Sequence, residues 1–221
     1  MHTTLGFGTA LLAMPLLSML LGLQIATPLV ALVMLTTIAI LVWSTRQSMD
    51  FRAAWQLLLA SAFGIPVGLL LVRSAPDVAL KGILGVVLIG FGSYNLTRPR
   101  LPTLRRNAWA APFGLAAGIL GGAYNTNGPP VVLYGALRHW PPDRLRATLQ
   151  GYFLPSAVLI CAGHAASGLW TWRVFRLYAL ALPVVLLAIP LGLRLGRRIP
   201  ADRFGRLLYA ALIVLGVGLL L

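Results

Sequence analysis

Charge is scarce in this sequence, and negative charge is the scarcest. Of the 221 residues only 10% are charged, whereas 59% are hydrophobic, and aspartate and glutamate together number four. A water-soluble domain of this length could not cover so much apolar surface with so few charged groups. The composition therefore excludes a soluble protein and predicts a membrane protein.

The sequence also has few of the side chains that carry chemistry inside membranes. Its acids are Asp50, Asp77, Asp143 and Asp202, all in predicted loops, so no embedded carboxylate is expected to bind a coupling cation. The single cysteine, Cys161, excludes an intramolecular disulfide and a cysteine-based metal site. We therefore expect no cofactor, no metal site and no catalytic residue.

Long apolar runs account for most of the chain. A helix that crosses the hydrocarbon core needs about 20 apolar residues. The runs that meet or approach this length cover residues 27–43, 53–72, 82–96, 147–168, 174–193 and 207–221. They predict an all-α, polytopic membrane protein whose first partner is the lipid bilayer.

Basic residues fill the gaps between these runs. The 18 lysines and arginines give a net charge of +14, which on a soluble protein would indicate nucleic-acid binding. Here they lie in short clusters between apolar segments, as the positive-inside rule describes. We therefore expect no nucleic-acid partner, and a cell inner membrane location with the basic loops on the cytoplasmic side.

The two halves of the chain repeat each other. Residues 65–68 (IPVG) are echoed by residues 189–192 (IPLG), and Phe51-Arg52 is echoed by Phe175-Arg176 at the same offset. Self-similarity of this kind indicates duplicated units. We predict a first transmembrane repeat over residues 1–97, a basic cytoplasmic linker over 98–107, and a second transmembrane repeat over 108–221.

The orientation of the second repeat depends on whether residues 109–138 cross the membrane once or dip in and return. A single crossing would divide lysine and arginine almost evenly between the two sides. A re-entrant hairpin leaves only Arg73, Lys81, Arg173 and Arg176 opposite all the other basic residues. The positive-inside rule favours the hairpin, which makes the repeats inverted, a common transporter arrangement.

The first repeat is predicted to be shortened at its N-terminus. Gly8 and Pro15 correspond to Gly122 and Pro129, so residues 6–15 match the tip and the outgoing half of the second hairpin. The ingoing half-helix would then precede Met1. Either the reading frame begins too late or the protein works without that half-helix.

A polar stretch, GGAYNTNGPP at 121–130, lies at the tip of the predicted hairpin. Non-helical backbone at membrane depth is tolerated only where protein or water satisfies its hydrogen bonds. Pro129 and Pro130 suit the first turn of a new helix, with Asn127 as its natural N-cap. This half-helix would aim its positive end, and the amides of Asn125 and Asn127, at the bilayer centre, which predicts an anion site.

A polar stripe is expected on the helix that follows. Gln150, Ala157, Cys161 and His164 recur at spacings of seven, four and three residues and so share one helix face. An ionisable residue inside a membrane is a functional candidate. The alternative for His164 is a neutral imidazole near a helix end, hydrogen-bonded to a carbonyl group.

The candidate substrate-binding residues come from these three elements. They are Gly122, Tyr124, Asn125, Thr126, Asn127 and Gly128 at the tip, Gly8 and Thr9 at its counterpart in the first repeat, and Gln150 and His164 on the stripe. The alternative for the tip is a kink whose asparagines only tie neighbouring helices together.

Three motifs resemble a known family. They are GFGTALLAMPLL at 6–17, GGAYNTNGPPVVLY at 121–134 and RLRATLQGYFL at 144–154. Together they resemble the sulfite exporter TauE/SafE family of bacterial membrane permeases, over nearly the whole chain. The resemblance implies an inner-membrane transporter for small sulfur-containing anions such as sulfite, sulfonates or thiosulfate.

The leading hypothesis is a permease, not an enzyme, that binds a small oxyanion at the hairpin tip and exports it by alternating access. An inside-negative potential drives a monoanion outward by about 2.3 kcal/mol per 100 mV, so export requires no coupling ion. The alternatives are a passive anion channel with the same tip, and a non-transporting membrane enzyme or assembly factor. The sequence leaves a homo-oligomer open.

Overall fold

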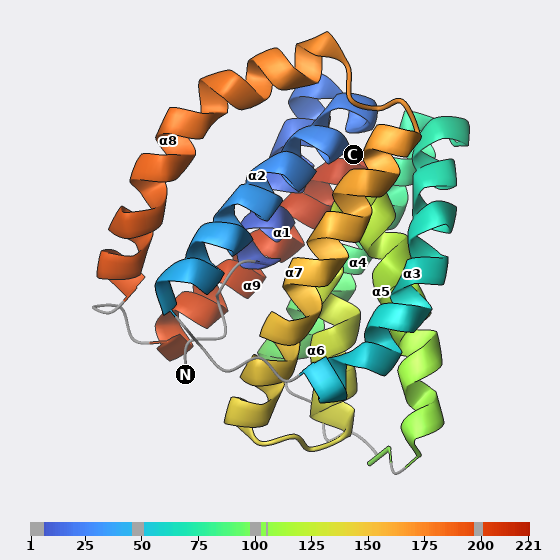
Figure 1. Ribbon diagram of the computed structural model, residues 1–221, viewed down its shortest axis with the longest axis vertical. Coiled ribbons are helices and arrows are strands. Elements are labelled where there is room, and N and C mark those ends of the chain that lie inside the picture. The colour runs from blue at the N-terminus through green and yellow to red at the C-terminus, as the bar shows by residue number, and fades with distance from the viewer. Residues whose placement is uncertain (1–6, 46–50, 98–102, 105, 197–200) are drawn as a thin grey trace.

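The computed structural model describes residues 7–45, 51–97, 103–104, 106–196 and 201–221 (Figure 1). In this part of the chain the regular structure is entirely helical. Its elements are α1 (Phe7–Leu21), α2 (Leu23–Thr45), α3 (Phe51–Ser74), α4 (Asp77–Thr97), the short 3-10 helix η1 (Asn107–Trp109), α5 (Ala110–Tyr124), α6 (Gly128–Leu137), α7 (Pro142–Ala166), α8 (Trp172–Gly196) and α9 (Ala201–Leu220).

Five of the described helices, α2, α3, α4, α7 and α8, are long and apolar enough to cross a membrane. They match the first five predicted runs, of which 147–168 extends two residues beyond α7, so the prediction of an all-α, polytopic membrane protein is confirmed. The sixth run, except for its last residue, lies in α9, where the apolar stretch Gly205–Leu220 is shorter than a membrane span. The predicted linker 98–107 falls largely outside the described residues.

Residues 109–138 form a re-entrant hairpin, as predicted. The half-helix α5 and the half-helix α6 run in opposite directions and return to the same end of the bundle (Figure 1). At that end the Leu104 N–H donates to the Leu137 carbonyl, 2.9 Å away. Arg138 Nη1 donates to the Leu104 carbonyl at 3.2 Å. The base of the hairpin is therefore closed by direct hydrogen bonds.

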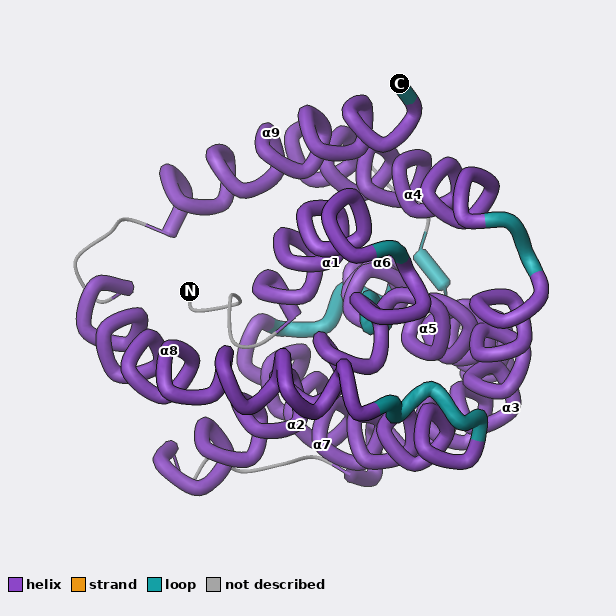
Figure 2. Tube along the Cα trace, turned by 90° about the horizontal axis from the view of Figure 1, so that it is seen from above, coloured by secondary structure: helices purple, strands orange, loops and turns teal. Residues whose placement is uncertain are grey.

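The packing of the helices is consistent with two inverted repeats. If α2 corresponds to α7, and α3 to α8, then a contact between α3 and α7 should have a counterpart between α8 and α2, and both contacts are present. The helices α4 and α9, which correspond to each other in the two repeats, also pack together. Figure 2 shows α1 and α6, the remaining counterparts, inside a ring formed by the other helices. The inverted relationship and the domain boundaries stay predictions.

Glycines bring α3 and α5 into backbone contact. A Cβ atom on Gly118 would overlap the backbone oxygen of Ser61, and one on Gly122 would lie 2.5 Å from the oxygen of Ile65. Gly64 and Gly68 on α3 face α5 equally closely. Small residues four apart allow such packing inside a membrane, where van der Waals contact drives helix association. This interface holds the hairpin against the first repeat.

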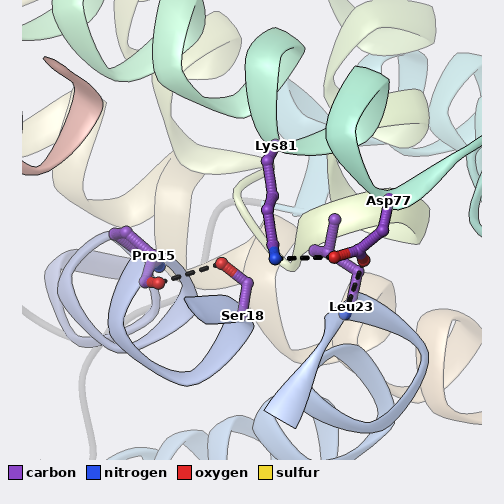
Figure 3. A network of polar contacts seen from close by, with 5 residues as sticks. All are labelled: Pro15, Ser18, Leu23, Asp77 and Lys81. Atoms are coloured by element: carbon purple, nitrogen blue, oxygen red, sulfur yellow. Dashed lines mark hydrogen bonds and ion pairs between the residues drawn. The ribbon is translucent and has the colours of Figure 1, made fainter. Parts of the chain in front are cut away.

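Asp143 and Asp202 lie in the first turns of α7 and α9, so the prediction that the acids lie in loops was wrong for them and for Asp77. Asp77 is the first residue of α4. A carboxylate in the first turn of a helix interacts favourably with the helix dipole. Its Oδ1 also accepts a hydrogen bond of 3.1 Å from the N–H of Leu23 at the start of α2. Lys81 Nζ lies 2.6 Å from its other oxygen (Figure 3). Asp77 thus joins the beginnings of two helices.

Candidate functional site

The chain breaks between α5 and α6 in the interior of the protein. Asn125 has a left-handed backbone with φ of 55°, which ends α5 and turns the chain. Its N–H donates to the Gly121 carbonyl at 2.9 Å, and the Thr126 N–H donates to the Leu120 carbonyl at 3.2 Å. All residues from 121 to 130 are buried. The predicted polar tip therefore lies inside the bundle.

The two asparagines of the tip bind neighbouring helices. Asn125 Nδ2 donates to the Thr27 carbonyl on α2 at 2.7 Å, and Asn127 Nδ2 donates to Ser156 Oγ on α7 at 3.0 Å. Asn127 occupies the N-cap position of α6, but its side chain makes no capping bond. Buried amides must find hydrogen-bond partners. The tie between helices that formed the alternative interpretation is thus present.

Two further tip residues face the protein. The hydroxyl of Tyr124 donates to the Leu80 carbonyl on α4 at 3.0 Å. Thr126 is fully buried, with its hydroxyl 3.5 Å from the Leu120 carbonyl. Tyr124 therefore anchors the end of α5 to the first repeat, while Thr126 closes the turn.

Sequence reasoning missed three hydroxyl side chains that support the hairpin, two of them at its tip. Thr27 Oγ1 donates to the Ala123 carbonyl at 3.1 Å. Ser156, which receives the Asn127 amide, donates to the Phe153 carbonyl at 3.1 Å. Ser61 donates to the Gly114 carbonyl at 2.7 Å. Each is a small polar residue in an apolar helix, a pattern that marks helix contacts in membranes.

His164 touches the end of α5. Its Nε2 lies 3.2 Å from the carbonyl oxygen of Gly122, and the side chain is completely buried. Because a carbonyl only accepts, Nε2 carries the proton. The other ring nitrogen, Nδ1, is buried without a partner. The predicted alternative, a neutral histidine bonded to a carbonyl near a helix end, describes this contact.

The remaining candidates lie away from the tip contacts described so far. Gly8 is buried, and a Cβ atom on it would lie 3.7 Å from the Leu208 side chain of α9. Thr9 is exposed. Gln150 is partly buried on α7. A role for these three residues in binding stays a prediction.

A groove of about 550 Å³ lies elsewhere, between the outer sides of α3 and α5. Trp55, Leu59 and Phe63 line it from α3, and Pro112 and Leu115 line it from α5. It contains none of the predicted site residues. Its apolar walls suit lipid contact better than the binding of an anion.

The sequence of this chain matches a described protein family. The model of the family described as sulfite exporter TauE/SafE matches residues 1–219. The chain belongs to this family. A TauE/SafE relative from Cupriavidus necator, named "Probable sulfite/organosulfonate exporter TauE", is 26% identical over 227 residues, covering 100% of this chain and 88% of the relative. No solved structure matches the chain significantly.

Membership of the TauE/SafE family confirms the resemblance that the three motifs indicated. Together with five apolar helices of spanning length, it makes the chain a multi-pass membrane permease of an exporter family. The GGAYNTNGPP motif of this TauE/SafE member forms the buried turn between α5 and α6. The RLRAT motif, residues 144–148, lies in the first two turns of α7.

Proposed function

We propose that the protein exports a small sulfur-containing oxyanion, sulfite or an organosulfonate, across the inner membrane by alternating access between its two repeats. The hairpin tip is its binding site. The observation that carries the proposal is the buried N-terminus of α6, which begins at Gly128 within the bundle. A helix N-terminus attracts anions through its dipole and its free N–H groups.

The opposite helix end at the tip does not cancel this attraction. The last carbonyl groups of α5 would repel an anion, but three of the last four have a donor: Gly121 accepts from the Asn125 N–H, Gly122 from His164, and Ala123 from Thr27. No acidic residue lies between 121 and 130. The positive end of α6 therefore dominates the local potential.

Backbone groups supply the donors. The first N–H groups of a helix have no intrahelical partner, but Pro129 and Pro130 have no N–H. The N–H groups of Asn127 and Gly128 remain. Because the asparagine amides are used for contacts with α2 and α7, we assign them the task of holding the tip in shape. This refines the sequence-based expectation that they would bind the anion directly.

The membrane potential can drive this export. An inside-negative potential assists the outward movement of a monoanion by about 2.3 kcal/mol per 100 mV. A carrier and a passive channel would share this driving force. The contacts of α3 with α7 and of α2 with α8 are those expected of the predicted inverted repeats, which supports a carrier whose repeats rock against each other.

Purified protein in liposomes tests the proposal. We expect sulfite flux that saturates, shows counterflow, and is inhibited by thiosulfate or sulfoacetate but weakly by chloride. Asn127→Leu should remove at least about nine-tenths of the flux, because it breaks the contact with Ser156. Asn95→Leu is the matched control, since Asn95 donates only to Phe91 in its own helix. Absence of flux for every anion would reject the function, and continuous single-channel currents would establish the channel.

A further inference from the structure

Three buried side-chain nitrogens in the described part of the chain have no hydrogen-bond partner. They are Arg146 Nε, His164 Nδ1 and Trp170 Nε1. Leaving a buried donor or acceptor unsatisfied costs about 1–3 kcal/mol. Such groups are rare, and each requires an explanation. Two of them, those of Arg146 and His164, lie on the same helix, α7.

These two residues also lie on the same face of α7. They are 18 positions apart (164 minus 146), which is five turns at about 3.6 residues per turn, and about 27 Å along the helix axis. Arg146 and His164 therefore lie near the two ends of one face of α7.

Arg146, Gln150, Cys161 and His164, with the small residue Ala157, form what we call the polar face of α7. The buried Phe153 lies on the same face. The polar face lies between the hairpin tip and the first repeat. His164 contacts Gly122 of the tip, and Cys161 belongs to a buried cluster with Ala31 of α2. Other sides of α7 are occupied differently, since Tyr152 bonds Ser61 of α3 and Val158 is 50% exposed.

Arg146 has the chemistry to take up an oxyanion. A guanidinium presents Nε–H and a neighbouring Nη–H as a fork that matches two oxygens of one anion. The Nε–H of Arg146 is buried and unbonded. In the described part of the chain the ion pair found joins Lys81 to Asp77, so no described carboxylate compensates Arg146. It lies in the first turns of α7, two residues after Arg144, whose guanidinium lies over the Trp140 ring.

We propose that the polar face of α7 lines the path of the oxyanion, and that Arg146 captures it on the side of the hairpin base. The anion then moves along Gln150 to the tip, which lies beside Ser156, and leaves past His164. The inference rests on the proposed function and adds a route and a second binding group. The ligand must offer two oxygens to the fork, as sulfite and sulfonates do.

Arginine substitutions test the capture step in proteoliposomes. Arg146→Lys keeps the charge but loses the Nε–H, so the sulfite concentration at half-maximal flux should rise by about tenfold or more. Arg144→Lys is the matched control, because Arg144 lies two residues away and packs on Trp140 with 5.2 Å between the guanidinium carbon and the ring centre. It should change that concentration by less than about twofold. Equal effects of the two variants would overturn the assignment of Arg146.

A lipid phosphate could occupy the same guanidinium fork. The liposome composition distinguishes a lipid headgroup from free sulfite as the ligand of Arg146. The effect of Arg146→Lys should be the same in liposomes of phosphatidylcholine alone and in liposomes that contain phosphatidylglycerol. If the effect appears only with phosphatidylglycerol, Arg146 binds a lipid headgroup and the capture role is overturned. Binding of sulfite by the protein in lipid-free detergent, lost in Arg146→Lys, would support capture.

Thiol accessibility tests the route independently of transport rates. In a Cys161→Ser background, Ala157→Cys on the polar face should react with a membrane-impermeant thiol reagent and be protected by sulfite. Val158→Cys, which points away from this face, should not react. An unreactive Ala157→Cys would overturn the route, even if Arg146→Lys fails to fold. If the wild-type protein shows no flux of any anion while Ala157→Cys reacts and is protected by sulfite, only the proposed function is rejected.

Discussion

The side-chain amide of Asn125 donates a hydrogen bond to the backbone carbonyl of Thr27, 2.7 Å away. In return, the Thr27 hydroxyl donates to the carbonyl of Ala123 at 3.1 Å. Thr27 belongs to α2 in the first half of the chain, whereas both partners belong to the hairpin tip in the second. The two halves are therefore joined at the proposed binding site, and any movement of one against the other must carry or break this pair.

Thr27→Val tests the second of these bonds. Valine keeps the shape of threonine but leaves the Ala123 carbonyl without its donor, so we expect a loss of about 1 kcal/mol in stability. We also expect slower sulfite flux, because the unpaired carbonyl adds negative potential at the tip. The melting temperature in detergent and the initial flux measure the two effects. Thr97→Val is the control, since Thr97 is exposed and bonds within α4.

Gly118→Ala should separate α3 from α5. The added Cβ would overlap the backbone oxygen of Ser61, which cannot move aside as a flexible side chain could. Overpacking of this kind costs about 1–3 kcal/mol or more, so the melting temperature should fall by several degrees. Gly90→Ala in α4 is the control, because no atom lies within 4 Å of its added Cβ. Equal melting temperatures for the two variants would contradict the backbone contact between α3 and α5.

Two substitutions of Asp77 separate the stabilising effects of its two contacts. Asp77→Asn keeps an oxygen that can accept from the Leu23 N–H but loses the charge that faces Lys81. The Asp77 side chain is 44% exposed, so the ion pair should contribute less than about 1 kcal/mol. Asp77→Ala loses the capping bond as well, for which about 1 kcal/mol is typical. Denaturation in detergent should therefore rank wild type, Asp77→Asn and Asp77→Ala in that order of decreasing stability.

The features that the sequence predicted are those encoded locally. Apolar runs define the spanning helices, and the cluster of Gly, Asn and Pro at 121–130 defines the turn of the hairpin, because each depends on neighbouring residues in the chain. The directions of the Asn125 and Asn127 amides could not be predicted in this way. Their partners, Thr27 and Ser156, lie far away in sequence.

The first IPVG segment of the repeat also indicated a helix-packing face, which was not recognised from the sequence. Gly64 and Gly68 belong to the first IPVG segment and its approach, and they identify the face that packs on α5. The corresponding helix of the second half, α8, lies along the outer edge of the bundle (Figure 1). Only 6% of the most apolar stretch of 18 residues in α8 is buried. Equivalent sequences thus meet different surroundings, which only the tertiary structure reveals.

His164 gives the sharpest test of how the tip favours an anion. His164→Leu removes the donor from the Gly122 carbonyl and uncovers the negative end of α5, so sulfite flux should fall by about tenfold or more. His164→Gln can still donate an N–H to that carbonyl and should keep at least about a third of the flux. Val158→Ala, on the exposed side of α7 away from the polar face, is the control and should stay close to wild type. Flux in His164→Leu equal to that of His164→Gln would show that covering this carbonyl does not matter, because the two variants differ mainly in that donor.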